Sequence, residues 1–526
     1  MLPPRNRWEA TCAHALVLAC ALVVAGCLVG PDYKQPYVPL NAHWNSKGDP
    51  RVTSQSPIDV AWWKSFNDPT LDRLVEIAYE QNLPLQIAGL KILEARAQIG
   101  IAVGYYYPVN QNPIASGGGG GIHNDNLNLY FGQYQVGFDA AWELDFWGKF
   151  RRGVRAARAS YFATVADYED AVVALTAEVA RTYILIRTFQ SLIELGRQNV
   201  AVQEDGLRVA QARLKNGATS GLDVAQASNL LESTRATIPQ LQIGLEQAQN
   251  ALCTLLSRAT GCQDLSVGPQ AIPTPPPQVA VSVPAELLRR RPDIRGAELS
   301  AVAQCNRIGV AKADLFPSIN LLGALGTRTV STSTSGAASI LSGLLGIFNP
   351  GTLIYSIGLS IFWPVLNYPK ILNNVRVEDA RFQQALFNYE NTVFKAAQEV
   401  EDGLTGFLHQ QEAAVFEQNA VTAAQDAVKL ALVQYREGAV DYTRVLDTQR
   451  ALLLSQNDLA RARSSVVTNL VALYKALGGG WELREGRPVV TDATRVEMQK
   501  RTNWGSYFRK PGPQPKNANG SPTTSR

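Results

Sequence analysis

Two hydrophobic patterns alternate along the chain. In some tracts apolar residues recur every three or four positions, which is the spacing of an amphipathic helix, and in others every second residue is apolar, as in a strand with one apolar face. The helical pattern covers residues 69–104 and four longer tracts, about 148–216, 220–257, 366–437 and 441–478. Because a continuous helix of roughly 70 residues would extend on the order of 100 Å, these tracts are predicted to pack side by side as coiled coils.

The strand pattern is unusually long. From Tyr130 to Phe146, mostly apolar or small residues at even positions alternate with Gln, Gly, Asp and Glu at most odd positions. A second such run covers 352–363, and weaker runs at 105–116 and 316–327 are predicted to pair with these two as hairpins. Strands of more than ten residues with one apolar face are typical of membrane β-barrels, with a soluble antiparallel sheet as the alternative.

Closing such a barrel needs more than one chain. Four strands are too few, since the smallest membrane barrels have about eight. An open strand edge is not viable in lipid. The chain after residue 26 also has no run of 18 apolar residues that would predict a spanning helix. A barrel therefore implies an oligomer.

The chain contains an internal repeat. The segment QIGIAVGYYYP at 98–108 matches RIGVAKADLFP at 307–317, an offset of 209 (307 minus 98). From Trp142 and Trp363 onward the offset is 221 (363 minus 142), and the increase falls in the Ser/Thr/Gly-rich stretch 326–346. We therefore expect two tandem, structurally equivalent halves that differ in the length of one loop.

The repeat sets the domain boundaries. A first repeat at 69–270 and a second at 285–481 are separated by a proline-rich linker at 271–284. Residues 27–68 form an N-terminal segment before the first repeat. Residues 482–526 form a basic tail that is predicted to be disordered.

Each half contains a turn between two long helical tracts. Gly217 and Gly438 are natural C′ glycines that end one helix, and Ser220 and Asp441 are N-caps that begin the next. Asp223, three residues after Ser220, makes a variant of the capping box. The same turn is thus predicted twice.

The N-terminus has the features of a signal peptide. Arg5 and Arg7 precede an 11-residue apolar stretch at 15–25, which is too short to span a membrane as a helix. The stretch ends in Val-Ala-Gly-Cys, which resembles the bacterial lipobox. Residues 1–26 are then removed, and Cys27 carries diacylglycerol and a fatty acid that anchor the chain. The alternative is an ordinary secretory signal with a chance cysteine.

Composition excludes several functions. The net charge is +4, but the last 27 residues supply +6 without a single acid, so the rest of the chain shows no nucleic-acid-binding character. Four histidines and two methionines predict no metal site and no cofactor apart from the lipid. No Ser/His/Asp set or phosphate-binding loop stands out, so an enzyme is not predicted.

Three cysteines follow Cys27, and export to an oxidising compartment makes a disulfide possible. Cys253 and Cys262 are close enough in sequence to bridge across a helix end, and two free thiols are the alternative. Cys305 then has no partner and is expected to be a small buried hydrophobic residue.

Three motifs carry a resemblance to a known family, the TolC-like outer-membrane factors. GCLVGPDYKQP (26–36) is similar to the mature start of the lipidated, OprM- or NodT-like efflux subgroup. WELDFWGK (142–149) is similar to the end of its second strand, and RRRPDIRGAE (289–298) to the start of its second half. The resemblance covers about residues 26–481.

The resemblance implies an α+β membrane protein that assembles as a homotrimer. Its 12-stranded outer-membrane β-barrel, with four strands per chain, would continue into a long periplasmic α-helical coiled-coil barrel. The implied function is the exit channel of a tripartite efflux pump, which passively conducts small molecules or drugs across the outer membrane of a Gram-negative bacterium. The implied partners are a periplasmic adaptor, an inner-membrane RND-type transporter and outer-membrane lipid. The alternatives are the exit duct of a type I protein-secretion system and a lipid-anchored periplasmic scaffold without a pore.

The resemblance also implies a gate at the periplasmic helix tips, with Tyr435, Arg444, Asp447 and Asp223 near the closed aperture. Threefold symmetry would gather each residue into a ring of three, and a ring of carboxylates concentrates cations. The alternatives are that Asp223 only caps its helix and that Asp447 forms an exposed ion pair with Arg444 or Arg450.

Trp142 and Trp363 occupy equivalent positions on the apolar strand faces. They are candidates for the aromatic girdle at a membrane interface. Packing in a core against the start of the next helix is the alternative.

Overall fold

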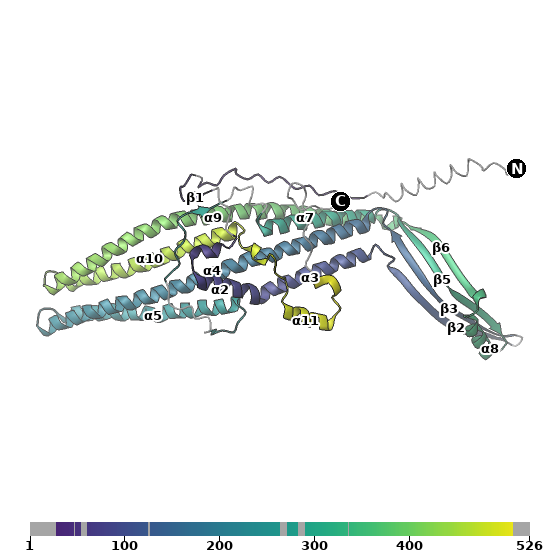
Figure 1. The fold of residues 1–526 in the computed structure, drawn as a ribbon, viewed down its shortest axis with the longest axis horizontal. Helices are drawn as coiled ribbons and strands as arrows, with labels where there is room; N and C mark the ends of the chain where they lie inside the picture. Colours follow the sequence, from purple (N-terminus) through teal and green to yellow (C-terminus); the bar gives the residue numbers. More distant parts are fainter. Residues whose placement is uncertain are drawn as a thin grey trace. The chain divides into compact units, whose positions relative to one another are not determined.

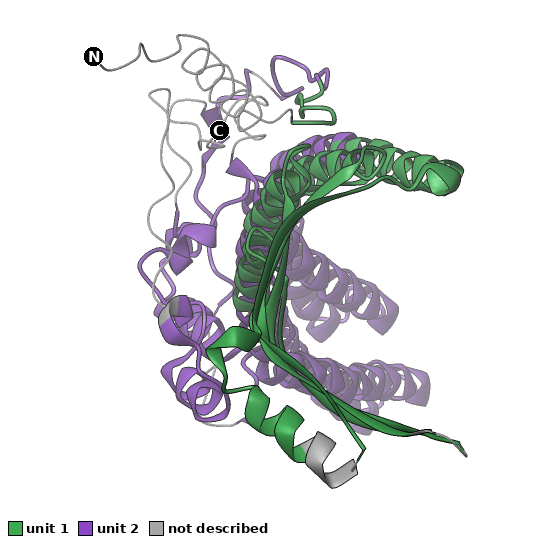
Figure 2. Ribbon diagram, turned by 90° about the vertical axis from the view of Figure 1, so that its right-hand side faces the viewer, with its two compact units in different colours: residues 1–36, 93–163, 297–389 green, residues 37–92, 164–296, 390–526 purple. Residues whose placement is uncertain are grey.

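The computed structural model describes residues 28–46, 48–53, 60–124, 127–262, 271–281, 290–334 and 336–508. The expected signal peptide, the expected lipidation site Cys27 and the end of the basic tail lie outside these residues. The chain divides into two compact units, coloured separately in Figure 2: residues 1–36, 93–163 and 297–389 form unit 1, and residues 37–92, 164–296 and 390–526 form unit 2. Within the described ranges, no helix is both long and apolar enough to cross a membrane.

Unit 1 contains one four-stranded sheet. Its strands are β2 (Asn110–Asn124), β3 (Leu127–Leu144), β5 (Ser318–Ser333) and β6 (Leu353–Phe362), in the order β2-β3-β5-β6. Every neighbouring pair is antiparallel. Figure 2 shows the strands as a single curved layer, in which β2 and β6 are the edges.

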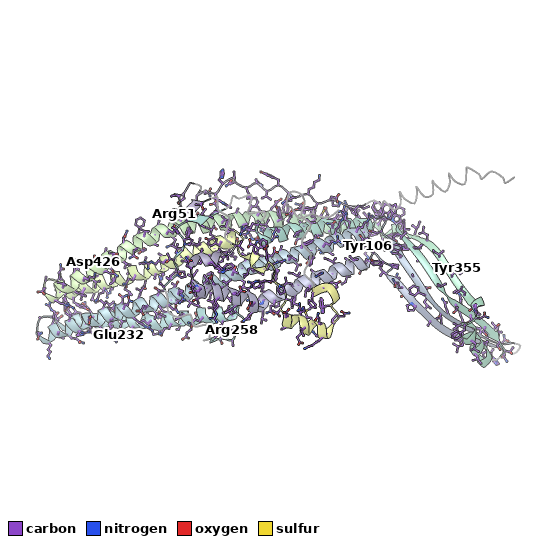
Figure 3. All side chains as sticks on the ribbon, viewed as in Figure 1. Arg51, Tyr106, Glu232, Arg258, Tyr355 and Asp426 are labelled. Carbon is purple, nitrogen blue, oxygen red and sulfur yellow. A yellow bond between two sulfur atoms is a disulfide. The ribbon has the colours of Figure 1, made fainter. Side chains whose placement is uncertain are left out.

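The pairing register gives the sheet two different faces, because residues paired across antiparallel strands point to the same side. One row across the four strands reads Pro113, Phe138, Leu325 and Tyr355, and the neighbouring row on the other face reads Asn112, Asp139, Ala324 and Ser356. The alternation expected from the sequence runs in register through β3, β6 and the first half of β5, whereas glycines interrupt it in β2 and Thr and Ser residues interrupt it in β5 from residue 327 onward. We call the first face the apolar face; Tyr355, labelled in Figure 3, is 80% exposed on it.

β2 differs from the predicted run at 105–116. It begins at Asn110 because helix α3 (Leu83–Gly104) continues to Gly104 and the next residues form a turn. It continues to Asn124 through five consecutive glycines. Aromatic rings of β3 cover these glycines: a Cβ on Gly117 would lie 2.7 Å from the Tyr134 ring, and one on Gly120 would lie 2.6 Å from the Phe131 ring. Such aromatic cover stabilises glycine in a strand.

The connections of unit 1 differ in length. β2 and β3 are joined by a short turn, whereas β5 and β6 are joined through helix α8 (Gly336–Gly346) and the 3-10 turn η2 (Pro350–Thr352), shown beside the strand ends in Figure 1. The extra residues of the second half thus lie in this connection, as the repeat predicts. Another turn, η3 (Val365–Asn367), follows β6.

The long helical tracts form α4 (Lys149–Lys215), α5 (Gly221–Leu255), α9 (Tyr368–Arg436) and α10 (Tyr442–Ala476). The first and last residues of α10 follow those of α5 by the same repeat offset (442 minus 221, and 476 minus 255). The second half opens with α7 (Pro292–Ala313). The residues of unit 2 also include a short parallel ladder between β1 (Val52–Thr53) and β4 (Val279–Ala280).

The expected helix at 69–104 is two helices, α2 (Pro69–Gln81) and α3, separated at Asn82. Asn82 has an extended backbone, and its side-chain oxygen accepts a hydrogen bond of 2.8 Å from the backbone N–H of Leu85. Pro84 is compatible with the first turn of the new helix but not with a helix interior. Before α2, the turn η1 (Trp62–Phe66) buries Trp62 completely against Tyr474.

The predicted disorder of 482–526 is wrong for residues 482–508. These residues complete η4 (Trp481–Arg484) and form α11 (Asp492–Arg501) and η5 (Gly505–Phe508). Arg484 pairs with Glu169 at 3.2 Å, and Arg487 pairs with Glu76 at 2.6 Å. The basic composition pointed to disorder, but these arginines reach carboxylates that lie far earlier in the sequence.

The sequence left open which cysteines form a disulfide. Cys253 and Cys262 are joined by a disulfide at the end of α5. Cys305 is a free, completely buried thiol on α7, and burial raises its pKa.

Candidate gate at the helix tips

Two turns of unit 2 lie side by side at one end of the long helices (Figure 1). The first joins α4 to α5 and the second joins α9 to α10. Gly217 has φ +67° and Gly438 has φ +79°, the left-handed conformation that glycine adopts at low cost. The N–H of Ala218 donates to the Arg213 carbonyl at 2.9 Å, and the equivalent bond in the second turn measures 2.8 Å. The two turns therefore have the same backbone design.

The expected side-chain caps are absent from both turns. Ser220 and Asp441 stand at the N-cap positions with extended backbones, but neither side chain accepts a hydrogen bond from its helix. The predicted capping box between Ser220 and Asp223 is therefore wrong. The carboxylate of Asp223 instead accepts hydrogen bonds from the hydroxyls of Thr219 and Tyr435, and the second partner draws it toward the other turn.

Arg213, which sequence reasoning missed, connects the two turns. Its guanidinium donates to the backbone carbonyls of Tyr435 and Arg436 at the end of α9, and to that of Ala218 at 3.2 Å. Its Cζ atom lies 4.7 Å from the centre of the Tyr435 ring. A cation at the carbonyl end of a helix is favourable, and so is its contact with an aromatic face. The only signal in the sequence was a basic residue in the last turn of α4.

Tyr435 is the centre of this contact. Its side chain is 2% exposed, and its hydroxyl donates to Oδ2 of Asp223 at 3.0 Å. Burial is the main cause that raises the pKa of Tyr435. The ring of Tyr442 lies edge-on 5.0 Å away, and burial, with smaller effects of Tyr435 and Asp223, raises its pKa to about 12. Both phenols are thus neutral at physiological pH, and that of Tyr435 donates to Asp223. We call Arg213, Thr219, Asp223 and Tyr435 the tip latch.

The four expected gate residues therefore separate into two pairs. Tyr435 and Asp223 belong to the tip latch, whereas Arg444 and Asp447 are exposed on α10. Among the described residues, neither Arg444 nor Asp447 forms an ion pair, so the expected alternative of an exposed pair is not seen within the chain. Asp223 has more than a capping role, because its carboxylate contacts the second turn.

Apolar side chains and unpartnered polar groups lie beneath the tip latch. Tyr435 and Tyr442 pack with Val445 and Leu446 of α10 and with alanines and leucines of the other three helices. Further along the same helices, Gln203, Thr234 and Gln449 are at most 2% exposed, and their side-chain polar atoms have no hydrogen-bond partner in the described part of the chain. The latch is therefore the polar contact between the two turns, above a mostly apolar interior.

The two expected girdle tryptophans occupy equivalent environments in unit 1. The indole N–H of Trp142 donates to the Tyr106 carbonyl at 2.8 Å, and that of Trp363 donates to the Leu315 carbonyl at 3.1 Å. The Trp142 side chain is 38% exposed and that of Trp363 is 55% exposed, so neither packs in a core within the chain. A bonded N–H beside an exposed ring suits a membrane interface.

In the ranges that the structure covers, no group of three or more His, Cys, Asp or Glu side chains is arranged to hold an ion. The tip latch is instead an arrangement of neutral donors, one carboxylate and one guanidinium, which can hold or release neighbouring helices.

Comparison with known proteins decides the family. Residues 74–258 and 283–479 each match the family model described as outer membrane efflux protein. This chain belongs to that family. The starts of the two matched stretches differ by 209 (283 minus 74) and their ends by 221 (479 minus 258), which are the two offsets of the internal repeat.

Individual relatives of this outer membrane efflux protein match nearly their whole length. The solvent efflux pump outer membrane protein SrpC of Pseudomonas putida is 32% identical over 483 residues, which cover 90% of this chain and 99% of SrpC. The probable outer membrane lipoprotein SilC of Salmonella typhimurium is 30% identical over 473 residues, 89% of this chain and 98% of SilC. The solved structure of the outer-membrane channel OprN has a TM-score of 0.79 and 31% identity, and the match covers 87% of this chain and 100% of OprN.

These matches confirm the predicted resemblance and function class. The family consists of outer-membrane efflux channels rather than enzymes, and this chain is an outer-membrane exit channel of an efflux system.

Proposed function

We propose that this outer membrane efflux protein is the trimeric exit duct of a tripartite pump, and that it passively conducts small molecules or drugs out of the periplasm. The observation that carries the proposal is the register of the four-stranded sheet. It separates an exposed apolar face from a face of small and polar residues. A wall with lipid on one side and a water-filled lumen on the other needs this separation.

The two sheet edges support a trimer. Among the strands that the structure describes, β2 and β6 each have a neighbour on one side only. Unpaired backbone groups in lipid cost several kcal/mol each, so the edges must pair with other copies. Three copies joined edge to edge would give a 12-stranded barrel. Trp142 and Trp363 then form the aromatic girdle on its periplasmic side, and the long helices of each chain contribute to a periplasmic coiled-coil barrel.

The proposed partners follow from the exit-duct role. A channel without an energy source depends on an inner-membrane transporter, for which we propose an RND-type pump, and on a periplasmic adaptor that joins the two. Lipid at Cys27 would anchor the chain, in line with its similarity to SilC, a probable outer membrane lipoprotein. The intact mass of the purified protein tests this anchor, because cleavage before Cys27 with added acyl groups differs from every unmodified product.

The tip latch is proposed as the gate. Its bonds hold the end of α9 to the turn between α4 and α5. An adaptor that offers better partners to these groups would shift the tips toward an open arrangement. Arg444 and Asp447, exposed beside the latch, are proposed to face the threefold axis and to set the charge of the aperture.

Single-channel conductance in planar bilayers tests the proposal. Asp223→Ala removes the acceptor shared by Thr219 and Tyr435, so conductance should rise well above the low wild-type value. The matched control is Asp426→Ala, which removes an exposed carboxylate of α9 outside the turn (labelled in Figure 3). Its conductance should equal the wild-type value. Equal conductance of all three proteins would move the gate elsewhere, and silence from all three, with insertion verified, would favour a scaffold without a pore.

A further inference from the structure

The proposed exit-duct function does not account for helix α8. It lies in the connection between β5 and β6, where the second half is longer than the first. Its last six residues, Leu341 to Gly346, are apolar or small and carry no charge. A surface helix without charged residues is unusual in water, because exposed helix faces are normally polar.

α8 lies directly on the sheet. It packs against β3 and β5, and Figure 2 shows it against the outer side of the curved layer. A Cβ on Gly343 would lie 2.7 Å from the Tyr134 ring, and a Cβ on Gly346 would lie 2.7 Å from the Thr329 side chain. Tyr134 and Thr329 are paired with each other and belong to the apolar face. The glycines therefore let the helix lie flat on the face that the exit-duct proposal exposes to lipid.

The protein itself supplies partners for the carbonyl end of α8. The last four carbonyls of a helix have no partner within it and normally bind water. Here the Thr329 hydroxyl donates to the Gly343 carbonyl at 2.7 Å, and the Thr352 hydroxyl donates to the Gly346 carbonyl at 3.2 Å. Ser331 and Ser342 share a further hydrogen bond of 2.5 Å. Internal partners of this kind are required where water is absent.

The surface of α8 that faces away from the sheet is apolar. Leu341, Leu344 and Leu345 are between 48% and 61% exposed, and Phe348, just beyond the helix, is 84% exposed. Their surface is continuous with the apolar face of the sheet, so the same medium would contact both.

The point where α8 contacts the sheet, at Tyr134, also falls within the height of the lipid-facing band of a membrane barrel. Tyr134 lies eight residues along β3 from Trp142 (142 minus 134). With a rise of about 3.3 Å per residue and a tilt of about 40°, this places the docking point roughly 20 Å from the girdle, inside a lipid-facing band about 25 Å tall. α8 would therefore lie near the far edge of the hydrocarbon region.

We propose that α8 is a membrane-embedded surface helix, which lies on the outside of the barrel wall and inserts Leu341, Leu344, Leu345 and Phe348 among the acyl chains of the outer leaflet. The inference rests on the proposed barrel. A neutral helix with an apolar exposed face and internally bonded carbonyls is suited to this medium. It gives the second hairpin an additional lipid contact that the first hairpin lacks.

Collision accessibility of a spin label tests the proposal on the full-length protein reconstituted into vesicles of phosphatidylethanolamine and phosphatidylglycerol. The label is placed at Leu345→Cys, and collisions are measured with oxygen, which concentrates in hydrocarbon, and with a polar nickel chelate, which does not. Leu359→Cys on the apolar face of β6 and Ser356→Cys on the opposite face are the matched controls. The parent protein, carried through labelling, sets the background from its own cysteines.

The oxygen-to-nickel ratio at position 345 should lie within about twofold of that at 359 and roughly tenfold above that at 356, because a polar probe is excluded from hydrocarbon. If the nickel chelate reaches a label at 345 but not one at 359, the inference is overturned and the barrel proposal stands. Low collision rates with both probes at 345 would also overturn it, since a protein neighbour would then cover α8. Nickel access at 359 itself would refute the barrel and the inference together.

Discussion

The two helix turns at the tips have the same backbone conformation but differ in the side chains that form hydrogen bonds. At positions related by the repeat offset of 221 (434 minus 213), Arg213 corresponds to Gln434, Asp223 to Arg444, Leu214 to Tyr435 and Gly221 to Tyr442. The glycines at 217 and 438 have nearly the same φ, and both turns close with the same backbone hydrogen bonds. The backbone of the turn is therefore the same in both halves, whereas the side chains of one turn are complementary to those of the other.

This difference shows how a repeated element can form a specific contact. The first turn supplies a guanidinium and a carboxylate, and the second supplies the phenol, the aromatic faces and the carbonyl groups that they bind. Each turn thus supplies groups that the other lacks, so that the donors of one turn meet acceptors of the other. The latch therefore depends on the asymmetry of the two halves.

Arg213→Ala should produce the largest effect on this asymmetric contact. It removes the hydrogen bonds to the end of α9 and the contact with the Tyr435 ring. We expect the closed tip to lose about 2 kcal/mol, which corresponds to roughly a 30-fold higher open probability in bilayer recordings. The matched control is Gln434→Ala, at the equivalent exposed position of the second turn, which should leave the open probability unchanged. Equal effects of the two substitutions would mean that the asymmetry has no role in closure.

Alkaline pH should lower the free energy of unfolding through Tyr442 of the second turn, an effect smaller than that of Arg213→Ala. Tyr442 has its pKa raised by burial to about 12, whereas an unfolded tyrosine titrates near 10. Between these values the unfolded chain loses its proton first, so the free energy of unfolding falls as pH rises. By pH 11 this effect of Tyr442 should have lowered the free energy of unfolding by about 1 kcal/mol.

Unfolding in urea, followed from pH 9 to pH 11, measures this loss. Tyr442→Phe should reduce the decline in stability by that amount, because phenylalanine has no hydroxyl to titrate. Identical pH profiles of the variant and the wild type would show that the phenol of Tyr442 is not held neutral by its surroundings.

The same two turns show what the sequence could predict. Glycine at the end of a helix and the repeat offset are signals in the sequence itself, so the turns and the element boundaries near them followed from pattern alone. The partner of Arg213 is a pair of carbonyls on another helix more than two hundred residues away, and no local pattern encodes that contact. The capping box failed for the related reason that Tyr435 competes for the Asp223 carboxylate.

Unit 1 and the C-terminal segment give the same lesson. The alternation of strand residues predicted two faces, and pairing aligned them across β3, β6 and the first half of β5. Residues 482–508 contact Glu76 and Glu169 through Arg487 and Arg484, and composition could not reveal these pairs. The placement of α8 on the sheet depends on glycines that meet Tyr134 and Thr329, a contact that appears only once the strands are in register.

Asp447→Asn should have the smallest effect on stability and a distinct effect on transport. Asp447 is exposed and unpaired among the described residues, so the free energy of unfolding should change by less than about 0.5 kcal/mol. If three copies of Asp447 surround the aperture, loss of their charge should lower the cation-over-anion permeability ratio by about twofold. Reversal potentials in a salt gradient measure this ratio. The equivalent position in the first half is Gln226, and Gln226→Ala changes no charge and should leave the ratio unchanged. A ratio that falls in both variants, or in neither, would mean that the second turn does not line the aperture, and the two turns would then differ only in the contact that they make with each other.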